Sequence, residues 1–217
     1  MLRSSRGFTT VEFLSAALCG TIVLFALYGF YREQLFSLLL EESRTSTLED
    51  ARGALDIMAR ELRNAGSFPV IPLPTDSNCL KDNSGKPLRV VSASSTSIQI
   101  QTDTESTGGG DPDGKCTATG ESVTYAIGGG TDACPGPMTI KRNGYCLVAN
   151  VVVSSKEPLF TYFDSNDTPF GGNPAVADVK RVRIRFSVEV PDPTPRGKSL
   201  GKTIKSTLSS SVEFRNS

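Results

Sequence analysis

A run of 19 residues without a charged side chain, residues 13–31, constrains this chain more than any other feature. An α-helix rises about 1.5 Å per residue, so a helix of this length matches the roughly 30 Å hydrocarbon core of a bilayer. Arg3 and Arg6 precede the run without any acidic residue beside them, and this bias holds an N-terminus in the cytoplasm. We therefore expect a single-pass membrane helix with a cytoplasmic N-terminus and an extracytoplasmic remainder.

A cleaved secretory signal peptide is the first alternative to a membrane anchor. The run is longer than the signal-peptide core of about 7 to 15 apolar residues. Residues 30–33, Phe-Tyr-Arg-Glu, also lack the pair of small residues that signal peptidase recognises. Ordinary signal-peptidase cleavage is therefore not expected at this point.

Glu12 is the residue that does not fit a plain membrane anchor, because its carboxylate lies within an otherwise apolar stretch. A charged side chain at the bilayer centre costs about 3 kcal/mol on insertion scales, and less near the end of a helix. One interpretation is that the carboxylate snorkels to the interface and has no further role. The residues around Glu12 favour a different interpretation of this carboxylate.

Residues 6–14, Arg-Gly-Phe-Thr-Thr-Val-Glu-Phe-Leu, resemble the class III signal peptide of type IV prepilins. That signal is a short basic leader ending in glycine, then an aromatic residue, then glutamate at the fifth mature position. The resemblance implies that a prepilin peptidase cuts after Gly7, that the new N-terminal Phe8 is N-methylated, and that Glu12 pairs with the N-terminal amine of a neighbouring subunit. Among packed apolar helices an ammonium and a carboxylate each need a partner, and each supplies the other's.

A second apolar pattern extends the helix beyond the membrane run. Apolar residues at spacings of three and four form one stripe: Leu48, Ala51, Leu55, Met58 and Leu62. Gly66 can take the left-handed conformation that ends a helix, and Pro69 blocks its continuation. The sequence predicts a helix from about residue 9 to residue 65. Residues 51–66 also resemble the corresponding segment of PilW-like minor pilins.

The rest of the chain is predicted to be a β-rich head. Short runs of strand-forming residues, separated by Gly, Pro, Asp, Asn and Ser, occur at 88–93, 97–102, 122–127, 138–142, 145–153, 159–163, 182–190 and 203–214. Residues 182–190 alternate strictly between apolar and polar side chains, so one face of that strand is buried. Asn143-Gly144 predicts a two-residue hairpin turn. We expect one antiparallel sheet packed on one helix, an α+β fold.

The prepilin resemblance makes this expected fold type IV pilin-like and implies four segments. Residues 1–7 form the leader peptide, and residues 8–31 the membrane-spanning, assembly half of the helix. Residues 32–66 form the amphipathic half packed on the head, and residues 67–217 form the extracytoplasmic head domain.

Five cysteines divide between the membrane run and the head. Cys19 lies in the run, where we interpret it as a small apolar residue. Four cysteines in an extracytoplasmic head indicate two disulfides, with three connectivities open. We favour Cys79–Cys116 and Cys134–Cys146, because each pair closes a local loop. A tetrathiolate zinc site is the rival, but no Cys-x-x-Cys pair supports it.

Two acidic, oxygen-rich loops are weak calcium candidates, since Ca²⁺ prefers oxygen ligands. Their candidate ligands are Asp111, Asp113, Asp164 and Asp167. Neither loop has the spacing of the twelve-residue calcium-binding loop with its terminal Glu, so solvated turns are the favoured interpretation. No cofactor is expected.

The composition argues against common catalytic sites and against nucleic-acid binding. The chain has no histidine, which removes Ser-His-Asp and Cys-His nucleophile pairs and histidine metal ligands. Lys and Arg number 23, and Asp and Glu also number 23, so no basic excess indicates a nucleic acid partner. We expect a structural protein and not an enzyme.

The resemblance implies a minor pilin that helps to prime or cap a type IV pilus. Its implied partners are a prepilin peptidase, other minor pilins, the major pilin, an inner-membrane assembly platform and a tip adhesin. Its implied location is the inner membrane and then the filament at the cell surface. Two alternatives stay open: a minor pseudopilin of type II secretion with the same N-terminal pattern, and a single-pass anchored periplasmic binding module or enzyme.

Overall fold

The computed structural model describes residues 9–69, 73–74, 77–104, 110–117, 120–131, 134–153, 157–171, 174, 176–192, 197 and 203–214. Gly7 and Phe8, the expected cleavage site, lie outside the described residues. The chain divides into two units. The first comprises Met1–Thr45 and Pro191–Lys202, and the second comprises Ser46–Val190 and Thr203–Ser217.

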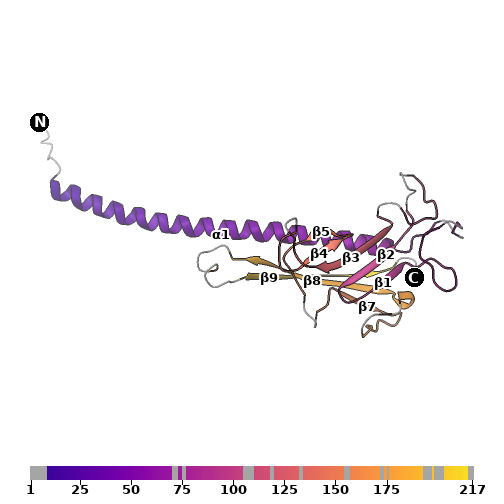
Figure 1. Ribbon diagram of the computed structural model, residues 1–217. Helices are drawn as coiled ribbons and strands as arrows, with labels where there is room; N and C mark the ends of the chain where they lie inside the picture. The colour runs from indigo at the N-terminus through magenta and orange to yellow at the C-terminus, as the bar shows by residue number, and fades with distance from the viewer. Residues whose placement is uncertain are drawn as a thin grey trace, which may run out of the picture. The chain divides into compact units, whose positions relative to one another are not determined.

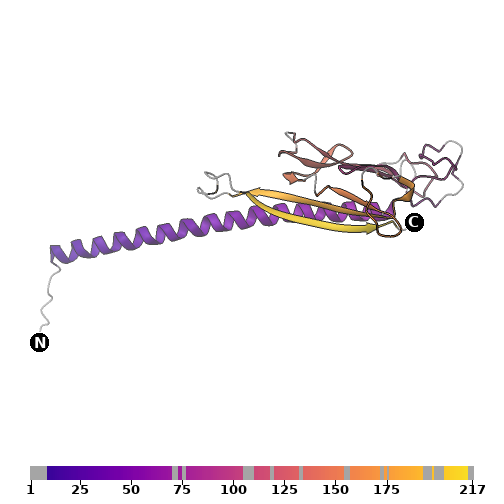
Figure 2. The same cartoon turned by 90° about the horizontal axis from the view of Figure 1, so that it is seen from below.

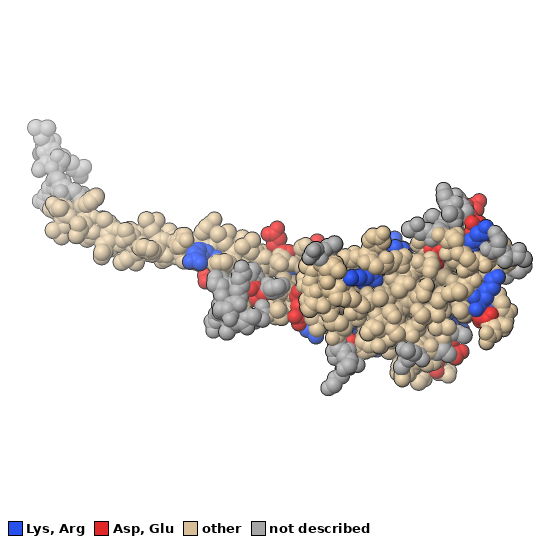
Figure 3. Space-filling view, in the orientation of Figure 1, with Lys and Arg blue, Asp and Glu red and all other residues tan. Residues whose placement is uncertain are grey.

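One long helix, α1 (Thr10–Asn64), contains both the uncharged run and the amphipathic stripe (Figure 1). In the first unit the large apolar side chains of the run are 56 to 78% exposed, on every side of the helix. The face shown in Figure 3 carries no charged atom along this N-terminal stretch. The helix is long and apolar enough to cross a membrane. An apolar surface on all sides calls for lipid or other helices around it.

The part of α1 in the second unit is amphipathic and contributes one stripe to the core. Its buried residues are Ala51, Ala54, Leu55, Met58, Ala59 and Leu62. They join buried strand residues in a single hydrophobic cluster. Figure 2 shows this part of the helix alongside the long strands of the second unit. The sequence prediction that this stripe packs on the strands is confirmed.

Five antiparallel strands form the first sheet in the order β1-β2-β3-β4-β5. They are β1 (Val90–Ala93), β2 (Ser97–Gln101), β3 (Ser122–Gly128), β4 (Thr139–Arg142) and β5 (Tyr145–Val148). The register places Ile98 opposite Tyr125 and Ile127 opposite Ile140. Asn143 and Gly144 both have positive φ, at 50° and 85°, as a tight hairpin turn of this kind requires. The predicted hairpin is therefore present.

Four strands form the second sheet, in which one strand pairs with the other three. They are β6 (Val151–Val152), β7 (Phe160–Phe163), β8 (Arg181–Pro191) and β9 (Thr203–Glu213), with a short 3₁₀ helix, η1 (Val176–Asp178), before β8. β8 pairs antiparallel with β6 and with β7, and it also pairs with β9. Val182, Ile184 and Phe186 of β8 are buried, as their alternation with arginines predicts.

The expectation of one sheet is wrong, because the chain changes sheets within the segment predicted as a single strand, residues 145–153. Val148 pairs with Ile140 in the first sheet, whereas Val151 pairs with Val188 in the second. Between them Asn150 has a φ of 52°, a left-handed conformation that ends the first strand. Asparagine adopts this conformation more readily than most residues, so the sequence contained a signal for the break.

The C-terminal end of α1 is held by the last residue of β2 and the residue that follows it. Gly66 has a φ of 79°, and its N–H donates to the Gln101 carbonyl at 3.0 Å. The Thr102 hydroxyl donates to the carbonyls of Asn64 and Ser67, at 3.3 and 3.2 Å. The bond from Thr102 to Asn64 satisfies a carbonyl that the helix end otherwise leaves unpaired. The predicted glycine stop is confirmed.

Candidate functional site

The first turn of α1 is closed by a reciprocal cap between Thr9 and Glu12. The Thr9 N–H and the Thr9 hydroxyl each donate to Glu12 Oε2 at 3.0 Å, and the Glu12 N–H donates to Thr9 Oγ1 at 3.3 Å. This is the capping-box arrangement, in which Thr-x-x-Glu satisfies free donors at a helix start. The Thr-x-x-Glu pattern is present in the sequence, but Glu12 was interpreted there by its charge and this cap was not predicted.

The cap fixes the Glu12 carboxylate while using only one of its oxygens. Oε2 accepts both bonds from Thr9, and Oε1 accepts none from any residue that the structure describes. The negative charge also lies at the end of the helix where the backbone dipole favours an anion. Glu12 is thus a carboxylate that Thr9 holds through one of its two oxygens.

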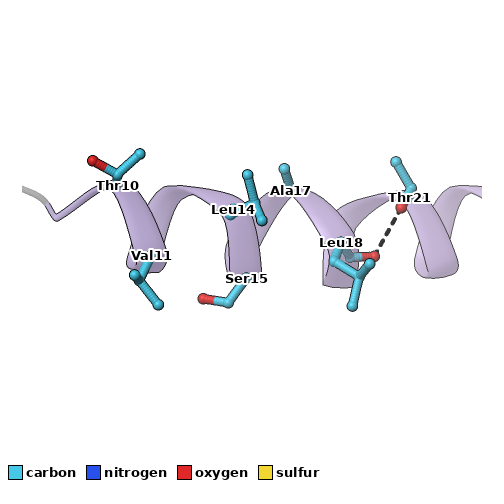
Figure 4. A pocket seen from close by; sticks show the side chains of 7 residues that line it. All are labelled: Thr10, Val11, Leu14, Ser15, Ala17, Leu18 and Thr21. Carbon is cyan, nitrogen blue, oxygen red and sulfur yellow. Dashed lines mark hydrogen bonds between the residues drawn. The ribbon is translucent and has the colours of Figure 1, made fainter.

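A shallow apolar groove begins within this capped turn and runs along the first turns of α1 (Figure 4). It is lined by Thr10, Val11, Leu14, Ser15, Ala17, Leu18 and Thr21. The Ser15 hydroxyl donates to the Glu12 carbonyl at 3.0 Å, and the Thr21 hydroxyl donates to the Leu18 carbonyl at 2.8 Å. Because their protons are used within the helix, these side chains add no unsatisfied donor to the groove. Small residues on such a face let a second helix approach closely.

The cysteines of the second unit form two disulfides, Cys79–Cys116 and Cys134–Cys146. These are the two pairs favoured from the sequence. Their sequence separations are 37 and 12 residues, so loop closure contributes about 4 and about 3 kcal/mol to stability in the chain-entropy treatment. Cys19 is the free cysteine and is exposed on α1.

Thiol counting on the denatured, unreduced full-length chain is expected to find one free thiol. That thiol should be Cys19, and a Cys19→Ala variant should give none under the same conditions. Reduction before counting should raise the value to five, the number of cysteines in the chain. Five thiols without reduction, or zinc bound in a one-to-one ratio, would contradict this pairing.

The four aspartates considered for calcium do not converge on one point. Asp164 Oδ1 accepts the N–H groups of Asn166 and Thr168, both at 2.8 Å, and so closes a turn. Asp167 pairs with Arg181 Nη2 at 2.6 Å. In the part of the chain that the structure describes, no three acidic or cysteine side chains are grouped to hold a metal ion. Asp111 is exposed, and Asp113 Oδ1 accepts the Lys115 N–H at 2.9 Å.

An ion pair fastens α1 to the first sheet within the second unit. The Glu61 carboxylate accepts three hydrogen bonds from Arg142. Nη2 donates to Oε1 at 2.9 Å, and Nε donates to Oε2 at 3.1 Å and to Oε1 at 3.2 Å. The buried Tyr125 hydroxyl donates to the same carboxylate at 2.5 Å. Burial, and then the hydrogen bond to the Glu61 carboxylate, raise the pKa of Tyr125, and the hydrogen bonds that Arg142 donates to Glu61 raise the pKa of Arg142. The phenol therefore stays neutral and the guanidinium charged, which suits a structural link and not a catalytic base.

Glu61→Ala is expected to lower the free energy of unfolding by about 3 kcal/mol, because it leaves a half-buried guanidinium and a buried phenol without their partner. Tyr125→Phe removes one hydrogen bond and should cost about 1 kcal/mol. The measurement is denaturant unfolding of the full chain in detergent. Arg60→Ala, one residue away on the exposed side of the helix, is the control and should change little. Equal losses for the Glu61 and Arg60 variants would contradict this role.

Comparison with known proteins finds no protein-family model, no curated protein and no solved structure that matches this chain.

Proposed function

We propose that this chain is a minor pilin of a type IV pilus, a non-catalytic subunit that helps to prime filament assembly. The observation that carries the proposal is the oriented Glu12 carboxylate at the start of a helix whose N-terminal half exposes apolar side chains on every side. A basic leader ending in Gly7 directly precedes it. An interfacial acid that only snorkels has no need of this combination.

The exposed apolar surface of α1 is compatible with two successive environments, a lipid bilayer and a filament. In the membrane, lipid covers the residues from Val11 to Tyr31, and in a filament the helices of neighbouring subunits would cover the same residues. Transfer between the two costs little hydrophobic energy, because lipid tails are as apolar as the side chains. Specific helix packing and polar pairs then decide which neighbours associate.

The Glu12 carboxylate is suited to setting the register of that association. After cleavage each subunit would present its Phe8 amine, and the carboxylate of a neighbour would neutralise it. A helical array repeats one heterologous contact, so a single acid can guide every addition. The groove beside Glu12 would accept the neighbouring helix closely enough for that pair to form.

The second unit supports a structural role for the head. Two disulfides and the Glu61–Arg142 pair stabilise a fold that contains no histidine. We propose that its partners are other minor pilins, the major pilin, the assembly platform and a tip adhesin. A prepilin peptidase would act on it before assembly.

Deletion of this chain from its own organism tests the proposal. Surface filaments counted by electron microscopy should fall to few or none, and the full chain supplied in trans should restore them. A Cys19→Ala chain should restore them equally, since Cys19 takes no part in the proposed contact. An unchanged filament number in the deletion strain would contradict the priming role.

A further inference from the structure

The two disulfides of the second unit differ in their exposure. Cys79 and Cys116 are both buried, at 5% and 8% exposed. Cys134 is also buried, at 1%, but its partner Cys146 is exposed. Thiol–disulfide exchange requires an attacking thiolate to reach one of the two sulfurs, and exposed disulfides are the labile ones. The difference therefore predicts that a thiol reaches the second bond through Cys146 and does not reach the first.

Cys146 lies on an edge strand and lines a groove. It belongs to β5, the last strand of the first sheet, and β4 is the only described strand that pairs with β5. The groove has a volume of about 530 Å³, and residues of α1, among them Gly53 and Ile57, line it together with Cys146. It gives a small molecule a path to Cys146. Its charged lining residues are Glu49 and Asp50, so it admits an uncharged thiol compound more readily than an anionic one.

Hydrogen bonds hold the segments on both sides of the Cys79–Cys116 bond in place. The Cys116 N–H donates to Asn78 Oδ1 at 2.9 Å. The Leu80 N–H donates to Gln101 Oε1 at 3.0 Å, and Gln101 Nε2 donates back to the Leu80 carbonyl at 2.6 Å. Gln101 is itself 3% exposed. This network must open before a thiol can attack the buried bond.

We propose that Cys134–Cys146 is a thiol-exchange site, which an uncharged dithiol opens by attack at Cys146 while Cys79–Cys116 stays closed. One thiolate of the dithiol forms a bond to Cys146 Sγ, the Cys134–Cys146 bond breaks, and the electron pair leaves on Cys134 Sγ, which takes up a proton. The second thiolate of the dithiol then displaces Cys146 Sγ, which is protonated in turn, and closes the dithiol's own disulfide. The protein gains two electrons and two protons, and the dithiol is oxidised.

Exchange at this site would change the stability of the head while leaving its core in place. The bond joins the segment before β4 to β5, across a sequence separation of 12 residues. Neither cysteine belongs to α1 or to the second sheet. Because the bond limits the freedom of the unfolded chain, its opening should lower Tm by about 8 °C. This inference is independent of the proposed filament role, because it concerns only the second unit.

Timed alkylation of the folded, full-length chain in detergent tests the site. The chain is treated with about 1 mM dithiothreitol, an uncharged dithiol, near pH 8, where thiolate is present. Samples are quenched with iodoacetamide at intervals, and mass spectrometry maps the labelled cysteines. We expect Cys134 and Cys146 to be labelled together, at least about tenfold faster than Cys79 and Cys116. In denaturant the two rates should become similar, because unfolding exposes both bonds.

Two double variants are the matched controls. A chain with Cys79→Ser and Cys116→Ser should keep the fast labelling. A chain with Cys134→Ser and Cys146→Ser should lose it, and should unfold about 8 °C below the wild type. Equal labelling rates for the two pairs in the folded wild-type chain would overturn the proposal, and so would faster labelling of Cys79 and Cys116. Labelling of Cys146 only after the chain unfolds would overturn it as well.

Discussion

Gly7→Val is expected to leave a full-length precursor in the inner membrane. A prepilin peptidase that recognises this leader must fit a residue without a side chain at the cut, and valine places a branched side chain there. The loss of cleavage should be nearly complete, so this effect is one of the two largest that we expect. Intact-mass measurement of the membrane-extracted chain distinguishes the precursor from a product lacking the seven leader residues.

Gly20→Val is the matched control for that experiment. It makes the same substitution within α1, at a position where an added Cβ meets nothing within 4 Å. We expect this variant to be cleaved normally. A mature chain of normal mass from Gly7→Val would contradict the cleavage assignment. Cleavage also removes Arg3 and Arg6, leaving 21 basic against 23 acidic side chains, so the mature chain should focus at a lower pH.

Glu12→Gln is expected to weaken association with neighbouring pilins while leaving insertion, cleavage and folding intact. An unpaired ammonium among packed helices costs about 3 kcal/mol, or roughly a hundredfold in association. Glutamine serves in a capping box as glutamate does, so the bonds with Thr9 should persist. The variant therefore removes the charge and keeps the cap.

Thr9→Val makes the complementary change, because it removes the capping hydroxyl and keeps the Glu12 charge. We expect it to retain most of the association that Glu12→Gln loses. Co-purification of other pilins from membranes measures both variants, after cleavage is verified in each. A snorkelling acid predicts unchanged or improved recovery for Glu12→Gln, and equal recovery from that variant and the wild type would exclude Glu12 as the register-setting residue.

Local features of the chain were predictable because their causes are local. The helix expected over residues 9–65 is observed as Thr10–Asn64, since its apolar periodicity and its glycine stop lie within the segment itself. The Asn143-Gly144 turn follows from the backbone conformations those two residues tolerate. The capping box at Glu12 is also a local feature, because Thr9 and Glu12 are three residues apart. It was not predicted, because Glu12 was interpreted by its charge.

Features that depend on distant residues were not predictable in the same way. Alternation in β8 shows that one face is buried, but it does not show which strands pair with it, and so two sheets were expected as one. The Glu61–Arg142 pair joins residues 81 positions apart. The sequence places Asp103 in a loop, and its burial beside the end of α1 is evident only from the structure. Each of these depends on tertiary contacts that no short window of sequence contains.

Mass spectrometry of the N-terminal peptide of the chain, isolated from membranes of its own organism, tests the pilin proposal most directly. The account predicts that the peptide begins at Phe8 and carries one methyl group on its α-amine. A peptide that still begins at Met1, or one cut at any other position, would contradict it.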